Sequence, residues 1–214
     1  MTTKNLFILS LLSVFLTACL GDKKGINIEE ANDTTSFINK DFKGNLIDYD
    51  MNQSACEGIS KADIASLYGV SEDLVTIIDN TKSDRRDPNS NPVCSFYIES
   101  GESDFMWLRG NMGIHREKKK EEYPEHAADV SEHSGNWKEI WALQKSVSRS
   151  SEWVSDLAKA AVWRGTDHNL KIKFDGYTLN IMPLRNVMNK EEQALNRDYK
   201  EIAIKMAKMS GYVN

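Results

Sequence analysis

The sequence predicts an α+β protein, in which an antiparallel sheet of about five strands is packed by a short N-terminal helix and a long C-terminal helix. Two observations support this prediction. Apolar and polar residues alternate over much of residues 93–116 and 160–182, which is typical of strands with one buried face. Apolar residues recur instead at helical spacing after residue 59 and again after residue 189.

The first helix is predicted to begin after Ser60 and to end at Gly69. Ser60 and Asp63 have the spacing of a capping box, in which each side chain accepts a hydrogen bond from the backbone N–H of the other residue. Ile59 and Ile64 stand at the positions of a hydrophobic staple. Local chemistry alone therefore predicts where this helix starts.

Residues 74–78 fit either a strand or a second short helix, and their β-branched side chains favour a strand. Residues 93–99 and 105–116 are predicted to form an antiparallel hairpin. Gly110 and Gly113, inside its second strand, indicate a bulge or a close backbone approach, and a ligand-facing groove is the alternative.

A three-strand meander is predicted over residues 160–163, 170–174 and 177–182. Asp175 and Gly176 separate two alternating runs and predict a type I′ turn, which needs positive φ at both positions. Pro183 is expected to end the last strand. Before the meander, Trp137, Ile140, Trp141 and Gln144 fall at helical spacing, but residues 141–147 fit a strand equally well.

The closing helix is predicted to be capped by Asn189, with Glu192 three residues on, and to end at Gly211. An apolar stripe along this helix is expected to lie on the sheet. The stripe consists of Leu195, Tyr199, Ile202, Met206 and Met209.

The N-terminus has the layout of a signal peptide, with basic Lys4 followed by a mostly apolar run too short to span a bilayer. Leu16-Thr17-Ala18-Cys19 resembles the lipobox of bacterial lipoproteins. This resemblance implies that residues 1–18 are removed and that Cys19 becomes an acylated, palmitate-bearing N-terminus on a membrane. Leu20 stands where an inner-membrane retention signal has Asp, which favours the outer membrane, facing the periplasm or the surface.

Residues 19–52 are predicted to be the lipidated N-terminus and a flexible tether, although apolar pairs in it could dock as an ordered arm. Residues 53–214 are predicted to form a single domain. Cys56 and Cys94 are an even pair in a chain expected to be exported, so we expect a disulfide between them. The absence of a Cys-x-x-Cys motif disfavours a redox or metal role for the pair.

The order of these features resembles a group of bacterial envelope lipoproteins, in which a Cys precedes a capped helix and a second Cys enters a strand. In that group a later hairpin is commonly introduced by Leu-Gly-Asp-x-Ala-x-Trp. Leu157, Ala161 and Trp163 match this motif, whereas Ala158 and Lys159 replace its Gly and Asp. The replacement implies a changed turn, and the resemblance carries no shared catalytic residues.

The charge of the chain limits its partners. Its formal net charge of -5 argues against nucleic acid as a partner and against binding of anionic lipid through a cluster of basic residues. A basic protein partner would fit this charge better than an acidic one. The sequence contains no His-Glu-x-x-His, no Gly-x-Ser-x-Gly and no phosphate-binding Gly loop. No cofactor is expected.

One group of residues could hold a metal ion. On a helix, Asp129 would lie one turn from both His126 and His133, so this carboxylate and one imidazole could share a divalent ion, with Glu122 or His115 as a further ligand. The two histidines would lie about 10 Å apart along the axis and could not both ligate the same ion. The alternative is a solvated helix.

The sequence therefore favours a membrane-anchored envelope lipoprotein that binds a protein or ligand without catalysis. An immunity-type lipoprotein that neutralises a toxin acting in the periplasm is one alternative, because the negative net charge and the predicted tether are compatible with that role. A metal-dependent hydrolase using His126, Asp129 and His133 is the other.

Overall fold

The computed structural model of this protein describes residues 33–122, 136–146 and 148–214. These residues confirm the predicted α+β class, with one antiparallel sheet of seven strands in the order β1-β2-β3-β7-β6-β5-β4. The sheet is larger than the sequence predicted. Its strands are β1 (Val75–Asp79), β2 (Val93–Ile98), β3 (Leu108–Arg116), β4 (Ser151–Trp153), β5 (Ala160–Arg164), β6 (Asn169–Lys173) and β7 (Tyr177–Arg185).

The two strands beyond the predicted hairpin and meander form the edges of the sheet. β1 settles the alternatives for residues 74–78 in favour of a strand, and it pairs with β2. β4 pairs with β5 over only three residues, from Ser151 to Trp153. A run this short is not recognisable from alternation of apolar and polar residues.

β7 continues through Pro183 to Arg185, so the prediction that Pro183 ends this strand is wrong. The register between β3 and β7 shifts between Arg109 and Asn111, and two residues of β7 lie opposite Gly110. This β-bulge confirms the prediction made from Gly110. A bulge leaves backbone groups outside the regular ladder, so a proline, which has no N–H, is tolerated there.

The described α-helices are α3 (Lys61–Tyr68), α5 (Trp137–Ser146), α6 (Lys190–Ala194) and α7 (Tyr199–Met209). In the described connections lie four short 3₁₀ helices, η1 (Glu72–Leu74), η2 (Asn80–Lys82), η3 (Asp104–Met106) and η4 (Lys120–Glu122). α3 begins as predicted, because both hydrogen bonds of the capping box between Ser60 and Asp63 are present. Gly69 closes it with a φ of 68°.

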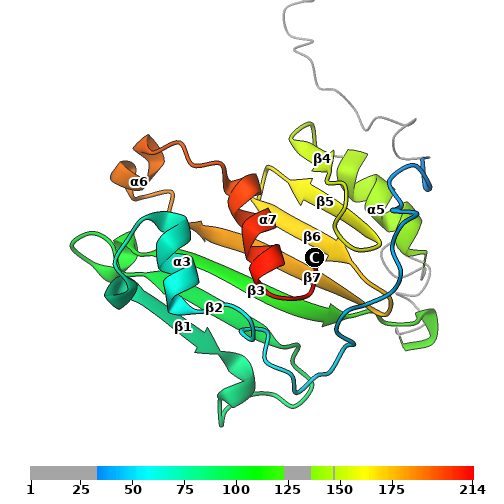
Figure 1. Ribbon diagram of the computed structural model, residues 1–214, viewed down its shortest axis with the longest axis horizontal. Helices are drawn as coiled ribbons and strands as arrows, with labels where there is room; N and C mark the ends of the chain where they lie inside the picture. The colour runs from blue at the N-terminus through cyan, green and yellow to red at the C-terminus, as the bar shows by residue number, and fades with distance from the viewer. Residues whose placement is uncertain (1–32, 123–135, 147) are drawn as a thin grey trace, which may run out of the picture.

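α3 and α7 lie across the same face of the sheet (Figure 1). They cover the main hydrophobic core, to which the strands contribute alternate side chains such as Phe96, Met112 and Leu179. α5 packs at the β4–β5 end of the opposite face, where Trp141 contacts Val162. The helical alternative therefore holds for residues 137–146.

The prediction of one long closing helix is wrong, because the chain forms α6 and α7 with a break between them. Asn196 has a φ of 46° in this break, and Asp198 then caps α7 through its side chain. Leu195, expected in the apolar stripe, is 59% exposed. Ile202 and Met206 retain the predicted role and are buried.

Residues 33–52, which we name the N-terminal arm, are in contact with the domain. The Asn39 side chain donates a hydrogen bond of 2.9 Å to the Ala158 carbonyl. Asn45 binds both the N–H and the C=O of Asp175, each at 2.9 Å. Of the residues in that turn, Gly176 has positive φ, at 81°, but Asp175 does not, so the turn is not the predicted type I′.

Cys56 and Cys94 form the expected disulfide. The bridge joins the segment before α3 to β2, with the two Cα atoms 4.9 Å apart. Cys94 is fully buried in the main core. The bridge thus holds the start of the helical layer against the sheet.

Candidate functional site

The face of the sheet opposite α3 and α7 is polar over β2, β3 and β7. At this face the described residues form a concavity of about 260 Å³, which we name the arginine pocket. Its polar lining side chains are those of Ser95, Tyr97, Arg109, Asn111, Asp167, His168 and Arg185.

The bulge between β3 and β7 builds this pocket. It places Arg109 directly opposite Arg185, so two guanidinium groups extend from neighbouring strands. Gly110 is required between them, because a Cβ atom there would lie 2.5 Å from the Met182 carbonyl oxygen. The close backbone approach and the paired arginines are therefore two consequences of one local irregularity.

Each arginine is held by a contact at the pocket rim. Arg109 donates a hydrogen bond of 3.0 Å to the backbone carbonyl of Asp104. Arg185 contacts Nδ1 of His168. A guanidinium only donates, so Nδ1 is the acceptor and the neutral imidazole carries its proton on Nε2. Burial, and next the Arg185 charge, lower the pKa of His168 and favour this neutral form.

The pocket remains positive although it contains a carboxylate. Asp167 lies in the turn between β5 and β6 and lines the pocket. Its Oδ2 is 3.3 Å from a guanidinium nitrogen of Arg164, which lies three residues earlier. Because Arg164 balances this carboxylate, the charges of Arg109 and Arg185 are left as the dominant ones.

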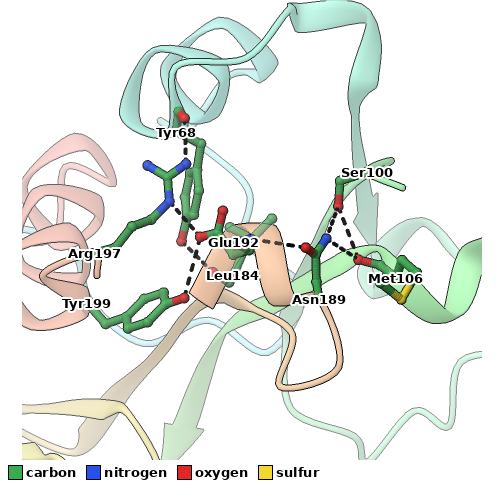
Figure 2. A network of polar contacts seen from close by, with 8 residues as sticks. All are labelled: Tyr68, Ser100, Met106, Leu184, Asn189, Glu192, Arg197 and Tyr199. Atoms are coloured by element: carbon green, nitrogen blue, oxygen red, sulfur yellow. Dashed lines mark hydrogen bonds and ion pairs between the residues drawn. The ribbon is translucent and has the colours of Figure 1, made fainter. Parts of the chain in front are cut away.

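A network of buried polar contacts joins α6 to α3 and β7, and Figure 2 shows its members. Glu192 is 6% exposed and accepts a hydrogen bond of 2.5 Å from Arg197. Arg197 also donates to the Tyr68 carbonyl at 2.9 Å and lies over the Tyr68 ring. The Tyr68 hydroxyl donates to the Leu184 carbonyl, and burial raises the pKa of Tyr68. α3, β7 and the α6–α7 break are thereby joined.

Two asparagines tie the chain after β7 to the chain before β3. Asn186 donates to the carbonyls of Phe105, at 2.6 Å, and Trp107, at 2.9 Å. Asn189 caps α6 and donates to the Met106 carbonyl at 3.0 Å (Figure 2). The ends of the two strands that carry the arginines are therefore fixed relative to each other, and the pocket is preorganised.

The chemistry that this arrangement offers is hydrogen-bond donation to an anion. Guanidinium groups match the planar geometry of carboxylate and phosphate oxygens, and they do not deprotonate in proteins. Tyr97, Ser95 and Asn111 add neutral donors on the same face.

Of the site residues that the sequence singled out, some lie outside the described residues and others lie within them. Cys19, His126, Asp129 and His133 lie outside the described residues. Glu122 lies at the edge of the described chain and binds Arg116 at 2.9 Å.

His115, on β3, contacts the Asn91 side chain at 3.3 Å. Within residues 33–122, 136–146 and 148–214, no three His, Cys, Asp or Glu side chains form a group that could hold a metal ion. In the same part of the chain, no helix is both long enough and apolar enough to cross a membrane.

The sequence patterns did not single out Arg109, Arg185 or His168. Gly110 was the one available signal, since a glycine within a strand suggested a bulge or a groove. The partner of Arg109 could not be named, because Arg185 lies beyond a proline that was expected to end its strand.

The fold defines this protein as a single-sheet α+β protein with helices on both faces and an arginine-lined concavity on one of them. No family model, curated protein or solved structure matches the chain. The assignment of function therefore depends on the site itself.

Proposed function

We propose that this protein is a lipid-anchored lipoprotein of the bacterial envelope, and that it binds a ligand or protein partner through the polar face of its sheet without catalysing a reaction. The observation that carries the binding role is the preorganised arginine pocket on that face. Concave sites with a few fixed polar groups are the usual places where proteins bind ligands.

The anchoring part of the proposal is supported by the lipobox-like Leu16-Thr17-Ala18-Cys19. Acylation of Cys19 would hold the protein on a membrane without a spanning helix. The favoured location is the outer membrane, because Leu20 follows the cysteine.

Metabolic labelling with palmitate tests the anchor. The wild-type protein should incorporate label and sediment with membranes, whereas Cys19→Ser should lose the label and appear in the soluble fraction. Equal sedimentation of the two proteins would contradict lipid anchoring.

Site-specific photo-crosslinking in cells tests the binding face. A crosslinker at Ile78 lies on β1 opposite Ser95, on the same face as the pocket, and Ile78 is 52% exposed. The matched control is a crosslinker at Ser66, which is exposed on α3 and belongs to the opposite face. A defined adduct from Ile78 and none from Ser66 is expected, and equal labelling from both would contradict the proposal.

A further inference from the structure

The geometry points to the arginine pocket as a binding site for an oxyanion, a carboxylate or phosphate group carried by the ligand. This inference rests on the proposed function and deepens it, because it names the chemistry recognised on the polar face. Three observations carry it: the opposed arginines, their uncommitted donors and the fixed position of the strand ends.

The opposed arginines are the first observation. Like charges directly opposite each other on neighbouring strands destabilise a sheet. Arg109 on β3 and Arg185 on β7 are such a pair. An anion between the two guanidinium groups would remove this repulsion. It would also form charge-assisted hydrogen bonds with both side chains, which are stronger than neutral ones.

The second observation is the number of donors that remain. A guanidinium has five N–H groups. Within the described part of the chain, the hydrogen bonds of the Arg109 and Arg185 side chains go to the Asp104 carbonyl and to His168. Asp167 in the same pocket is paired through Oδ2 with Arg164, so this single carboxylate, partly balanced by Arg164, faces two guanidinium groups.

The third observation is preorganisation. Asn186 directly follows Arg185 and binds the chain two and four residues before Arg109. The two arginines are therefore presented at a fixed separation, as recognition of a planar oxyanion requires. His168 acts as a positioning residue, because its contact with Arg185 orients that guanidinium.

Inorganic pyrophosphate and citrate are suitable probes, because they carry phosphate and carboxylate oxygens respectively. Each is titrated into the detergent-solubilised full chain at low ionic strength, with binding followed by calorimetry. At least one of the two probes is expected to bind, and their relative affinity identifies the preferred oxyanion.

Substitutions locate the binding. Arg109→Gln and Arg185→Gln should each weaken affinity about tenfold or more, because each removes a charge-assisted contact. Arg185→Lys should also weaken it, since a lysine keeps the charge but loses the fork of donors. Arg85→Gln is the matched control: it removes the same charge from an exposed loop position outside the pocket, and its affinity should stay within about twofold of wild type.

Two results would overturn the inference: neither probe binds, or Arg109→Gln and Arg85→Gln weaken binding equally. Its failure is distinguishable from failure of the proposed function. If Ile78 gave crosslinked adducts but neither probe bound, the proposed binding face would be supported and the oxyanion site would be contradicted. If a probe bound but no adducts or palmitate label appeared, the oxyanion site would be supported and the proposed function would be contradicted.

Discussion

Ala158 adopts a φ of 50°, in the left-handed region that residues other than glycine rarely enter. It lies in the turn that leads into β5, and its carbonyl accepts the hydrogen bond from Asn39 of the N-terminal arm. The backbone here thus has the conformation that a glycine would adopt without strain.

Ala158→Gly should therefore raise the free energy of unfolding by about 1 kcal/mol, because left-handed backbone costs a Cβ-bearing residue roughly that much. Urea denaturation measures the change. Ala62→Gly, on the exposed side of α3, is the control and should lower stability by up to about 1 kcal/mol, because glycine is a poor helix residue. A loss of stability in Ala158→Gly would contradict the assignment of strain.

His168 makes stability depend on pH. Its pKa in the folded protein lies below the ordinary value of 6.5, chiefly because of burial and next because of Arg185. As pH falls through 6.5, the unfolded chain takes up this proton before the folded protein does. The stabilisation from neutral His168 is thus complete above about pH 6.5 and is lost as pH falls towards the folded pKa.

His168→Asn should flatten the decline of unfolding free energy between about pH 7 and pH 5. Asn tolerates the left-handed backbone of this position, where φ is 51°, and keeps an acceptor for Arg185 but does not titrate in this range. The measurement is a series of urea midpoints for both proteins across that range. Parallel curves would show that His168 does not titrate with a lowered pKa.

At the scale of the element, strand β3 depends on a glycine at one position. Gly110→Ala should destabilise the protein by about 1–3 kcal/mol, because the new Cβ meets backbone atoms of β7 that cannot move independently. Gly113→Ala on the same strand is the matched control. There the Cβ would lie 3.0 Å from the His115 imidazole, which can rotate away. Equal thermal unfolding of the two variants would contradict the close approach at the bulge.

Helix α3 and the break between α6 and α7 show how differently elements depend on local sequence. α3 was predicted correctly from its capping box and Gly69, since these signals act within a few residues. The break was not predicted, because Leu195 fits the apolar spacing of the stripe in the sequence. In the structure its side chain is exposed instead of buried. Arg197 binds Glu192 of α6 and the Tyr68 carbonyl of α3, and the second of these contacts comes from a distant part of the chain.

At the scale of the whole molecule, the Cys56–Cys94 bridge links the two layers across a sequence separation of 38 residues. In the chain-entropy model, closing a loop of this length removes about 4 kcal/mol of unfolded-state freedom. The double variant Cys56→Ala/Cys94→Ala should therefore lower unfolding free energy by about that amount, as measured in urea.

Reductant should act on the wild-type protein in the same direction as the double substitution. Cys19→Ser, which leaves the bridge intact, is the control and should unfold like wild type. If reduction left the urea midpoint unchanged, the bridge would not contribute to stability.

The sequence by itself determined the α+β class, the start of α3, the β2–β3 hairpin, the β5–β6–β7 meander, the bulge at Gly110 and the cysteine pair, because their signals lie in spacing, caps and residue type. The tertiary structure alone decided edge strand β4, the passage of β7 through Pro183, the helix break and the arginine pocket. The physical reason is distance along the chain: Arg109 and Arg185 are 76 positions apart (185 − 109), and only strand pairing brings them opposite each other. A residue pattern records its own periodicity but not the register in which two distant segments meet.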